Sequence, residues 1–222
     1  MIPGIELSCE HGDSEVHILG LFIDWGSGWL RSRLRGLREA REKRALLILE
    51  KLNKEGVKMS ERALLSFGKG GSIGRLHFAR YLIENGYVSS VNEAFSKYLG
   101  RGKPAYIAKP KISPVEALDM INRTGGLSVI AHPVYGGDSM SFIKMLKSHG
   151  LCGIEVHHPG HDSQAAGRLL RIASELNLIA TGGSDSHGTC ADSVRVGCKT
   201  VSYEAVMMLK KEKLVRETGI MN

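Results

Sequence analysis

The sequence predicts an α/β fold in which short parallel strands alternate with amphipathic helices. Apolar runs suited to strands recur at residues 127–131, 153–156 and 178–181, and helical patterns at 139–149 and 163–176 separate them. This β-α-β-α-β order implies parallel strands joined by helical crossovers. Shorter apolar runs near the N-terminus and a long helical pattern after them complete the prediction.

The N-terminal region predicts a hairpin followed by a long helix. Residues 2–8 and 16–23 have the composition of short strands, and the polar segment 10–14 between them suits a turn. From Leu30 the apolar residues recur at three- and four-residue steps, which predicts an amphipathic helix ending before Gly56. Its outer face carries seven basic residues: Arg31, Arg33, Arg35, Arg38, Arg41, Lys43 and Arg44. Such a face is typical of a solvated helix surface, and a nucleic-acid-binding stripe is the alternative interpretation.

Residues 60–110 predict a small helical unit between these regions. The segment from Ser90 to Glu93 has the form of a capping box, which marks the start of a helix. Gly100 suits the end of that helix, and a basic, glycine-rich stretch follows it.

Composition narrows the class of protein and its partners. The 222 residues are 42% apolar and 24% charged, as in ordinary globular proteins. No apolar run approaches the roughly 18 residues that span a bilayer, and the N-terminus lacks the pattern of a signal peptide, so we expect a cytoplasmic protein without a membrane partner. The net charge of +7 favours anionic partners such as nucleotides or nucleic acid. The scattered cysteines suggest reduced thiols: Cys9, Cys152, Cys190 and Cys198.

Histidine and acidic residues follow the three predicted parallel strands at the points where the strands end. These residues are His132, Glu155, His157, His158, Asp185 and His187. The carboxyl ends of parallel strands meet at one edge of a sheet, where sites are built. Glu6 and His17 add a carboxylate and an imidazole, one on each early strand. Imidazole and carboxylate donors without cysteine suit manganese, iron or zinc in a catalytic site.

Each of these residues also has a purely structural interpretation. A histidine in an apolar strand, such as His17, is more often part of the core than a ligand. His132 precedes a proline and suits a strand-end cap, and Asp185 suits a turn cap. Their joint placement at the strand ends favours a metal site. His149, at the end of a predicted helix, and the exposed His11 are assigned no catalytic role.

Several motifs, in order along the chain, resemble the PHP family, named for polymerase and histidinol phosphatase. They are Gly-Ile-Glu-Leu-Ser at 4–8, Val-His-Ile-Leu-Gly at 16–20, Ala-His-Pro at 131–133 and Gly-Ser-Asp-Ser-His at 183–187. Further stretches, at 74–80, 91–100, 104–106 and 153–161, are similar to the branch that contains nucleotide phosphatases and 5′-to-3′ exoribonucleases acting on short RNA. The resemblance covers nearly the whole chain.

The resemblance implies a distorted (β/α)₇ barrel with a helical insertion and up to three divalent metal ions, of manganese, zinc or iron. Residues 1–29 and 111–222 would form the barrel, and 30–110 the inserted lid. By motif, Glu6 would be the bridging carboxylate and Asp185 a ligand of the first metal, while the third metal would take His17, His132 and His187. The substrate would meet Arg75, His77 and Tyr106 from the insertion, with His158 and His161 beside them.

The activity implied is hydrolysis of phosphomonoesters or phosphodiesters of nucleotides or short RNA or DNA by a metal-bound hydroxide, with Asp185 and His187 as catalytic residues. The sequence departs from the family pattern because the initial His-x-His motif is missing, so we expect a barrel that is incomplete at its N-terminus. Two alternatives therefore stay open. One is a degenerate, non-catalytic module that binds nucleic acid or phosphorylated ligands through residues 30–55 and 100–111. The other is one part of a longer gene product. Nothing in the sequence specifies the number of subunits.

Overall fold

The computed structural model describes residues 1–12, 14–67, 73–109, 112–187 and 195–219. It divides the chain into two compact units. The first, which we call the sheet unit, comprises Met1–Leu30 and Lys111–Asn222, and the second, which we call the helical unit, comprises Arg31–Pro110. No helix among the described residues is both long and apolar enough to cross a membrane.

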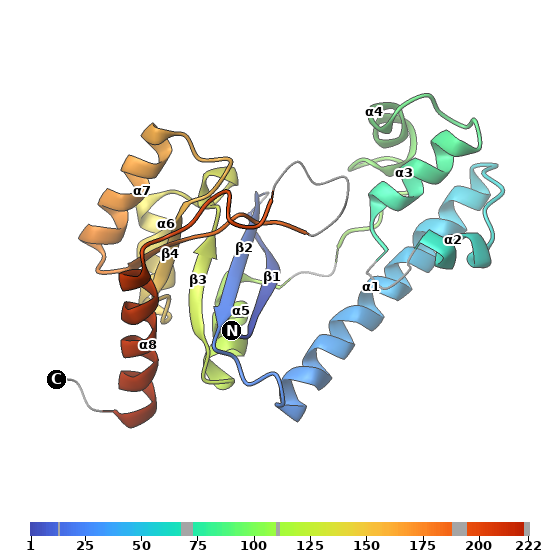
Figure 1. Cartoon of the computed structure of the whole chain (residues 1–222). Coiled ribbons are helices and arrows are strands. Elements are labelled where there is room, and N and C mark those ends of the chain that lie inside the picture. The colour runs from blue at the N-terminus through green and yellow to red at the C-terminus, as the bar shows by residue number, and fades with distance from the viewer. Residues whose placement is uncertain (13, 68–72, 110–111, 188–194, 220–222) are drawn as a thin grey trace. The chain divides into compact units, whose positions relative to one another are not determined.

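The sheet unit is built on five strands in the order β1-β2-β3-β4-β5 (Figure 1). They are β1 Gly4–His11, β2 Ser14–Leu21, β3 Leu127–Ala131, β4 Gly153–His157 and β5 Ile179–Gly182. The first three strands pair antiparallel, and β3, β4 and β5 pair parallel. The predicted hairpin and parallel strands are thus confirmed. Within the described residues the strand order ends at β1 and β5.

Four α-helices lie entirely within the described residues of this unit. They are α5 Pro114–Arg123, α6 Met140–Ser148, α7 Ser163–Glu175 and α8 Tyr203–Thr218. Helix α5 packs on β1, β2 and β3, α7 packs on β4 and β5, and α8 packs on β5. A Cβ atom added to Gly20 would lie 2.8 Å from Ile121 of α5, so Gly20 faces that helix. His17 lies three residues away in the same strand and therefore points to the opposite face.

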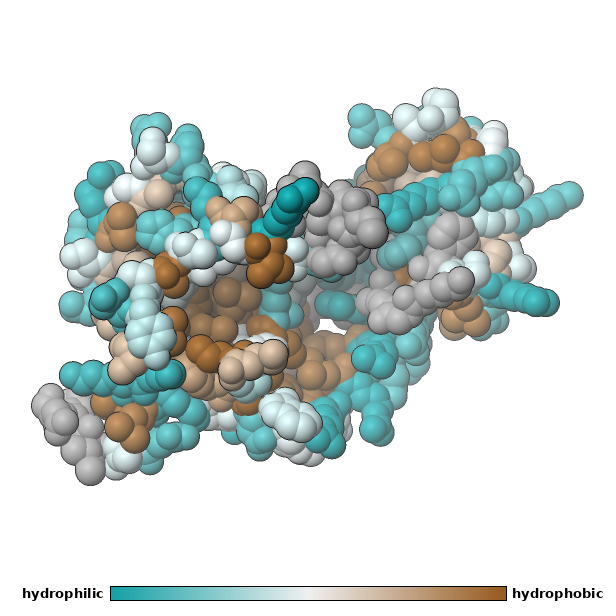
Figure 2. Space-filling model, viewed as in Figure 1, coloured by the Kyte–Doolittle hydropathy of each residue, from teal (hydrophilic) through white to brown (hydrophobic). Residues whose placement is uncertain are grey.

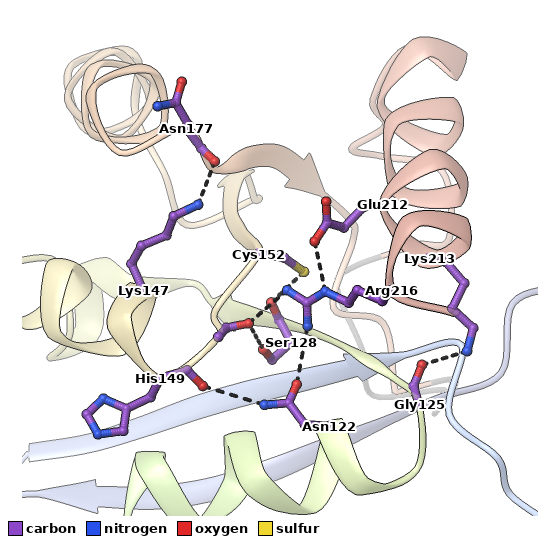
Figure 3. A network of polar contacts seen from close by, with 11 residues as sticks. Asn122, Gly125, Ser128, Lys147, His149, Cys152, Asn177, Glu212, Lys213 and Arg216 are labelled. Carbon is purple, nitrogen blue, oxygen red and sulfur yellow. Dashed lines mark hydrogen bonds and ion pairs between the residues drawn. The ribbon is translucent and has the colours of Figure 1, made fainter. Parts of the chain in front are cut away.

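A polar network fastens α8 to the segments where β3 and β4 begin (Figure 3). The Arg216 guanidinium donates to Asn122 Oδ1 at 3.3 Å and to the Gly150 carbonyl at 3.1 Å. Lys213 Nζ donates to the Gly125 carbonyl at 2.7 Å. The buried Cys152 thiol donates to a backbone carbonyl, and burial raises its pKa to about 11. The network lies beside the amino ends of the parallel strands, where polar contacts serve stability rather than chemistry.

The helical unit encloses its own apolar core. Its elements are α1 Gly28–Lys54, which enters the unit at Arg31, α2 Glu61–Phe67, α3 Arg75–Glu84, α4 Val91–Ala94 and a π-helical turn Phe95–Leu99. The largest fully buried side chains are Ile48, Leu52, Leu64, Phe78, Leu82 and Leu99. These residues recur at helical spacing, which is why the sequence pattern predicts the helices.

One predicted cap differs in detail. The Ser90 hydroxyl accepts a hydrogen bond from the Glu93 backbone N–H at 3.2 Å, as the capping box predicts. The Glu93 carboxylate, however, accepts from the backbone N–H of Ser89 at 2.7 Å, one residue before the predicted position. The Ser89 hydroxyl also donates to this carboxylate, at 2.6 Å, and the two hydrogen bonds from Ser89 lower the pKa of Glu93. The cap is therefore shared between two serines.

Candidate active site

Three side chains from β1, β2 and the end of β3 converge in the sheet unit. Glu6 Oε1 lies 2.8 Å from His17 Nδ1 and 3.4 Å from His132 Nε2. The same two ring nitrogens lie 3.2 Å apart. One oxygen or nitrogen atom from each residue lies within 4.8 Å of the other two, as ligands of a single metal ion would. We call these three residues the metal cluster.

The strand register explains this convergence. His17 of β2 pairs with Ser8 of β1 on one side and with Ala131 of β3 on the other. Residues that pair directly across antiparallel strands share a face, and so do residues two apart in one strand. Glu6, two residues before Ser8, therefore lies on the face that carries His17. His132 follows directly on Ala131, and the chain turns there into a short 3₁₀ helix, Pro133–Tyr135.

Backbone strain is concentrated at His132. Its φ of +25° lies in a region that residues other than glycine rarely adopt. The buried Glu155 of β4 accepts a hydrogen bond from the His132 backbone N–H at 2.7 Å. Strained backbone of this kind persists only where the surrounding structure holds it, and it is concentrated at functional sites. Glu155 is the described residue that provides this support.

The pKa values of the two carboxylates of the site, Glu6 and Glu155, are shifted in opposite directions. Hydrogen bonds from His132 and His17 hold the pKa of Glu6 far below its usual range. The bond to Glu6 in turn raises the pKa of His132. Burial raises the pKa of Glu155, against the lowering effect of the bond from His132. Glu6 is therefore the carboxylate arranged to be charged, which suits a bridging ligand.

Two further histidines continue the group after β4. The ring centres of His132 and His158 lie 5.3 Å apart, and those of His158 and His161 lie 5.1 Å apart. His158 Nδ1 accepts from the Gly160 backbone N–H at 3.0 Å, so the neutral ring carries its proton on Nε2. His161 Nδ1 donates to the Val156 carbonyl at 2.8 Å, so its Nε2 presents a lone pair.

Both Nε2 atoms are buried and lack a hydrogen-bond partner in the part of the chain that the structure describes. His158 is 7% exposed and His161 is 6% exposed. Burial lowers the pKa of His158, which favours its neutral form. Buried polar atoms without a hydrogen-bond partner are costly, so this donor and this acceptor suit a bound ligand. The Asp185 carboxylate is the described group that approaches the donor, at 3.6 Å.

Asp185 approaches this pair from the loop after β5. Its Oδ2 atom lies 3.6 Å from His158 Nε2, and its φ of +51° is a second point of strain. A Cβ atom at Gly182 would lie 2.4 Å from the His157 carbonyl oxygen, so only glycine lets β5 end so close to β4. His187 Nδ1 lies 2.9 Å from the Asp185 carbonyl oxygen, and neither residue belongs to the metal cluster. Their roles as metal ligands stay predictions.

The adjacent histidines after β4 point in different directions. His158 joins the other histidine rings, whereas His157 lines a separate cavity with Leu170, Ala180 and Met208. The structure therefore places only His158 beside the metal cluster.

The remaining predicted substrate residues have contacts within the helical unit. The Arg75 guanidinium carbon lies 5.3 Å from the ring centre of Phe95 and 5.6 Å from that of Tyr106. Arg75 also donates to the Leu99 carbonyl at 3.3 Å. His77 Nδ1 accepts from the Gly74 backbone N–H at 3.0 Å, which caps the start of α3. These contacts give all three residues local packing roles, and their contact with substrate stays a prediction.

Comparison with known proteins identifies the family, although no family model matches the chain. The chain is 34% identical over 194 residues to the 5'-3' exoribonuclease Rnm of Salmonella typhimurium, covering 86% of this chain and 66% of the relative. It is 33% identical to the 3',5'-nucleoside bisphosphate phosphatase of Chromobacterium violaceum, covering 84% and 67%. It is 31% identical to the phosphoribosyl 1,2-cyclic phosphate 1,2-diphosphodiesterase of Eggerthella lenta, covering 89% and 76%. The chain belongs to the PHP family of phosphoesterases.

Solved structures agree with this PHP assignment. A protein of Bifidobacterium adolescentis described as a metal-dependent phosphoesterase superposes with a TM-score of 0.75 at 28% identity, covering 97% of this chain and 76% of that one. An amidohydrolase structure from Chromobacterium violaceum, with bound sulfate and no metal, gives a TM-score of 0.73 at 30% identity and the same coverage. The family predicted from the motifs is thus confirmed, and the chain spans just under two thirds of the Salmonella exoribonuclease.

Proposed function

We propose that this protein is a metal-dependent phosphoesterase that hydrolyses phosphate esters of nucleotides or short oligonucleotides. The observation that supports this best is the metal cluster of Glu6, His17 and His132. One carboxylate oxygen and two imidazole nitrogens within 4.8 Å of one another are a donor set that manganese, zinc and iron accept. A divalent cation held there would polarise a phosphoryl oxygen and make water a stronger nucleophile.

The neighbouring side chains would bind and orient the phosphate. The Nε2–H of His158 is a buried donor without a hydrogen-bond partner among the described residues, and it suits a phosphate oxygen. The lone pair on His161 Nε2 suits a proton donor or a further cation. We assign Asp185 and His187 as further metal ligands of the catalytic centre, and Arg75, His77 and Tyr106 as substrate contacts. In the family's terms the sheet unit would be part of a distorted (β/α)₇ barrel, and the helical unit its insertion.

The relatives support the substrate class. Their names describe action on RNA, on a nucleoside bisphosphate and on a phosphoribosyl cyclic phosphate. Each of these substrates joins a phosphate to a ribose. The net charge of +7 favours such anionic substrates.

The test combines metal content with turnover. We expect the purified chain to contain bound manganese, zinc or iron by elemental analysis and to release phosphate from a panel of nucleotides in Mn²⁺. Glu6→Gln and Asp185→Ala should each lower turnover at least about a hundredfold, because both carboxylates would act through the metal. His149→Ala, in a histidine on the surface at the end of α6, is the matched control and should leave turnover unchanged. A folded chain without metal and without turnover would contradict the proposal.

A second candidate function, binding of nucleic acid by the helical unit, rests on the electrostatics of α1. This helix has no acidic residue in its first turn, and arginines crowd its first half. Arg31, Arg35 and Arg38 follow one another at helical spacing, and like charges at such spacing repel one another. Arg35 and Arg38 are exposed and have no ion pair or hydrogen bond among the described residues. Hydrophilic side chains dominate this part of the surface in Figure 2. A polyanion would offset the cost of these charges.

Salt dependence separates this candidate from a merely solvated helix. Arg35→Gln combined with Arg38→Gln should flatten the plot of log affinity for a single-stranded RNA against log salt concentration, by about 0.7 for each phosphate that the two arginines neutralise in the unmodified protein. The matched control, Lys144→Gln with Arg171→Gln, removes two exposed charges from the sheet unit. Equal slopes for both double variants would identify the α1 face as an ordinary solvated surface.

A further inference from the structure

We propose that Tyr135 forms a stacking platform for the base of the nucleotide whose phosphate lies at the metal cluster. The inference rests on the proposed function and deepens it, because it assigns a binding site for an aromatic base to this end of the sheet unit. Tyr135 belongs to none of the motifs that predict the active site, and it becomes a candidate only through its position in the structure.

Tyr135 is exposed, whereas the neighbouring His158 is buried. Its side chain is 61% exposed, although tyrosine usually buries most of its ring. Its ring centre lies 5.7 Å from that of His132 and 6.2 Å from that of His158. The ring therefore borders both the metal cluster and the partially unsatisfied histidine pair, and much of it stays open to a ligand.

The local backbone holds this exposed ring in place. Tyr135 ends the 3₁₀ helix that begins at Pro133, and Gly136 follows with a φ of +152°, which favours glycine. On the other side, a Cβ atom at Gly160 would overlap the Tyr135 hydroxyl oxygen. Only glycine at 160 leaves room for that hydroxyl. Gly136 and Gly160, on two different loops, thus make room for the Tyr135 ring in this position, although the ring is exposed to solvent.

The chemistry of this ring suits a nucleobase. A nucleotide carries its planar base one ribose away from its phosphate, so a base platform must lie near the phosphate site without occupying it. Tyr135 meets that condition, because it contacts the rings of His132 and His158 while its own ring stays exposed. Stacking between a base and an aromatic side chain tolerates every base, because each base has a π face. The platform would favour nucleotides over base-free phosphate esters without selecting one base.

The first test compares AMP with ribose 5-phosphate, which lacks the base. We expect Tyr135→Leu to raise KM for AMP about tenfold with little change in kcat, and to leave both constants for ribose 5-phosphate unchanged. Tyr135→Phe keeps the ring and removes the hydroxyl, so it should match the unmodified protein. Tyr203→Leu, in an exposed tyrosine at the start of α8, is the matched control and should change neither substrate's constants.

A binding measurement separates this inference from the proposed activity. Stacking quenches the fluorescence of 2-aminopurine riboside 5′-monophosphate, so its titration in EDTA reports the platform without turnover. We expect quenching by the unmodified protein and by Tyr135→Phe, and weaker quenching by Tyr135→Leu. Quenching without hydrolysis of any ester would support the platform and refute the phosphoesterase. Equal reductions for the Phe and Leu variants, or a KM increase shared by both substrates, would overturn the platform.

Discussion

The sheet unit differs from the helical unit in two buried polar atoms that lack a hydrogen bond among the described residues. In the helical unit Arg44 is buried, so its predicted place on the outer face of the helix is wrong. It donates to the carbonyls of Ile107 and Ala108 at 2.9 and 3.1 Å, which satisfies its charge within the fold. In the sheet unit, the buried Nε2 atoms of His158 and His161 have no hydrogen-bond partner among the described residues, and Asp185 Oδ2 lies 3.6 Å from the Nε2 atom of His158. The charge of Arg44 is thus satisfied inside the helical unit, whereas two buried nitrogens of the sheet unit, beside the metal cluster, lack a hydrogen bond among the described residues.

Backbone conformation follows the same division. Among the described residues other than glycine, positive φ values occur at Phe22, His132, Asn177 and Asp185, all in the sheet unit. His132 and Asp185 each lie within contact distance of His158. Local violations of the rules that stabilise a fold are expected at functional sites, and other interactions compensate for their cost. The comparison therefore supports the proposal that the metal chemistry belongs to the sheet unit, whereas the helical unit has its own apolar core and a charged surface.

The largest expected effect tests whether the two units are independent. Phe78 is fully buried in the core of the helical unit, and Phe78→Ala should cost about 3–5 kcal/mol of stability through reduced burial and a cavity. Hydrogen exchange followed by mass spectrometry should show weaker protection in α1, α2 and α3, with β2 to β5 protected as before. An equal decrease of protection in both units would mean that they unfold together and would weaken the comparison.

A smaller effect is expected at Glu155, whose carboxylate positions His132 through the strained backbone. Glu155→Ala should lower metal affinity or turnover about 10–100-fold, as for residues that orient a metal ligand. Glu155→Gln can still accept from the His132 N–H, so it should restore most of that decrease. The same variant removes a carboxylate whose ionisation burial disfavours, so it should melt no lower than the unmodified protein. Equal defects in both variants would show that the charge of Glu155, rather than its hydrogen bond, is required.

Much of the fold and part of the site are predictable from the sequence, because both depend on periodic patterns. The alternation of apolar runs and helical periods predicts β3, α6, β4, α7 and β5 in order. The capping sequence at Ser113 and Glu116 predicts the start of α5, where both reciprocal bonds are present. The family resemblance is what assigns Glu6, His17 and His132 to one metal site, and the pairing of β1, β2 and β3 is what brings their side chains together in the structure.

What the sequence cannot predict depends on contacts between distant segments. The sequence places Glu155 among the acidic residues near a strand end, but it does not reveal the partner of its carboxylate. Only the pairing of β3 with β4 brings Glu155 to the His132 N–H. A carboxylate in a buried strand is the one sequence signal that points to this role. For Arg75 the sequence suggests a role but not the contacts. Its position in a family motif suggests contact with substrate, whereas its contacts with the rings of Phe95 and Tyr106 depend on tertiary packing.

The smallest expected effect compares a glycine in one helix of each unit. Gly36 lies in α1 and Gly167 in α7, and a Cβ atom at either position would meet nothing within 4 Å. Gly36→Ala and Gly167→Ala should each raise the free energy of unfolding by about 0.5–1 kcal/mol, because alanine loses less backbone entropy in a helix. Chemical denaturation and hydrogen exchange should locate each gain in its own unit.

Gly36→Ala and Gly167→Ala should stabilise the protein to a similar extent, so RNA affinity and turnover are the measurements that can distinguish them. Gly36 lies among the arginines of α1, so Gly36→Ala stiffens the face proposed to bind nucleic acid while leaving every charge in place. If that face binds RNA as a preformed helix, affinity should stay equal or rise, and turnover on mononucleotides should not change. A decrease of RNA affinity in this more stable variant would show that α1 must bend to bind, and that its glycine is kept for function at the expense of stability.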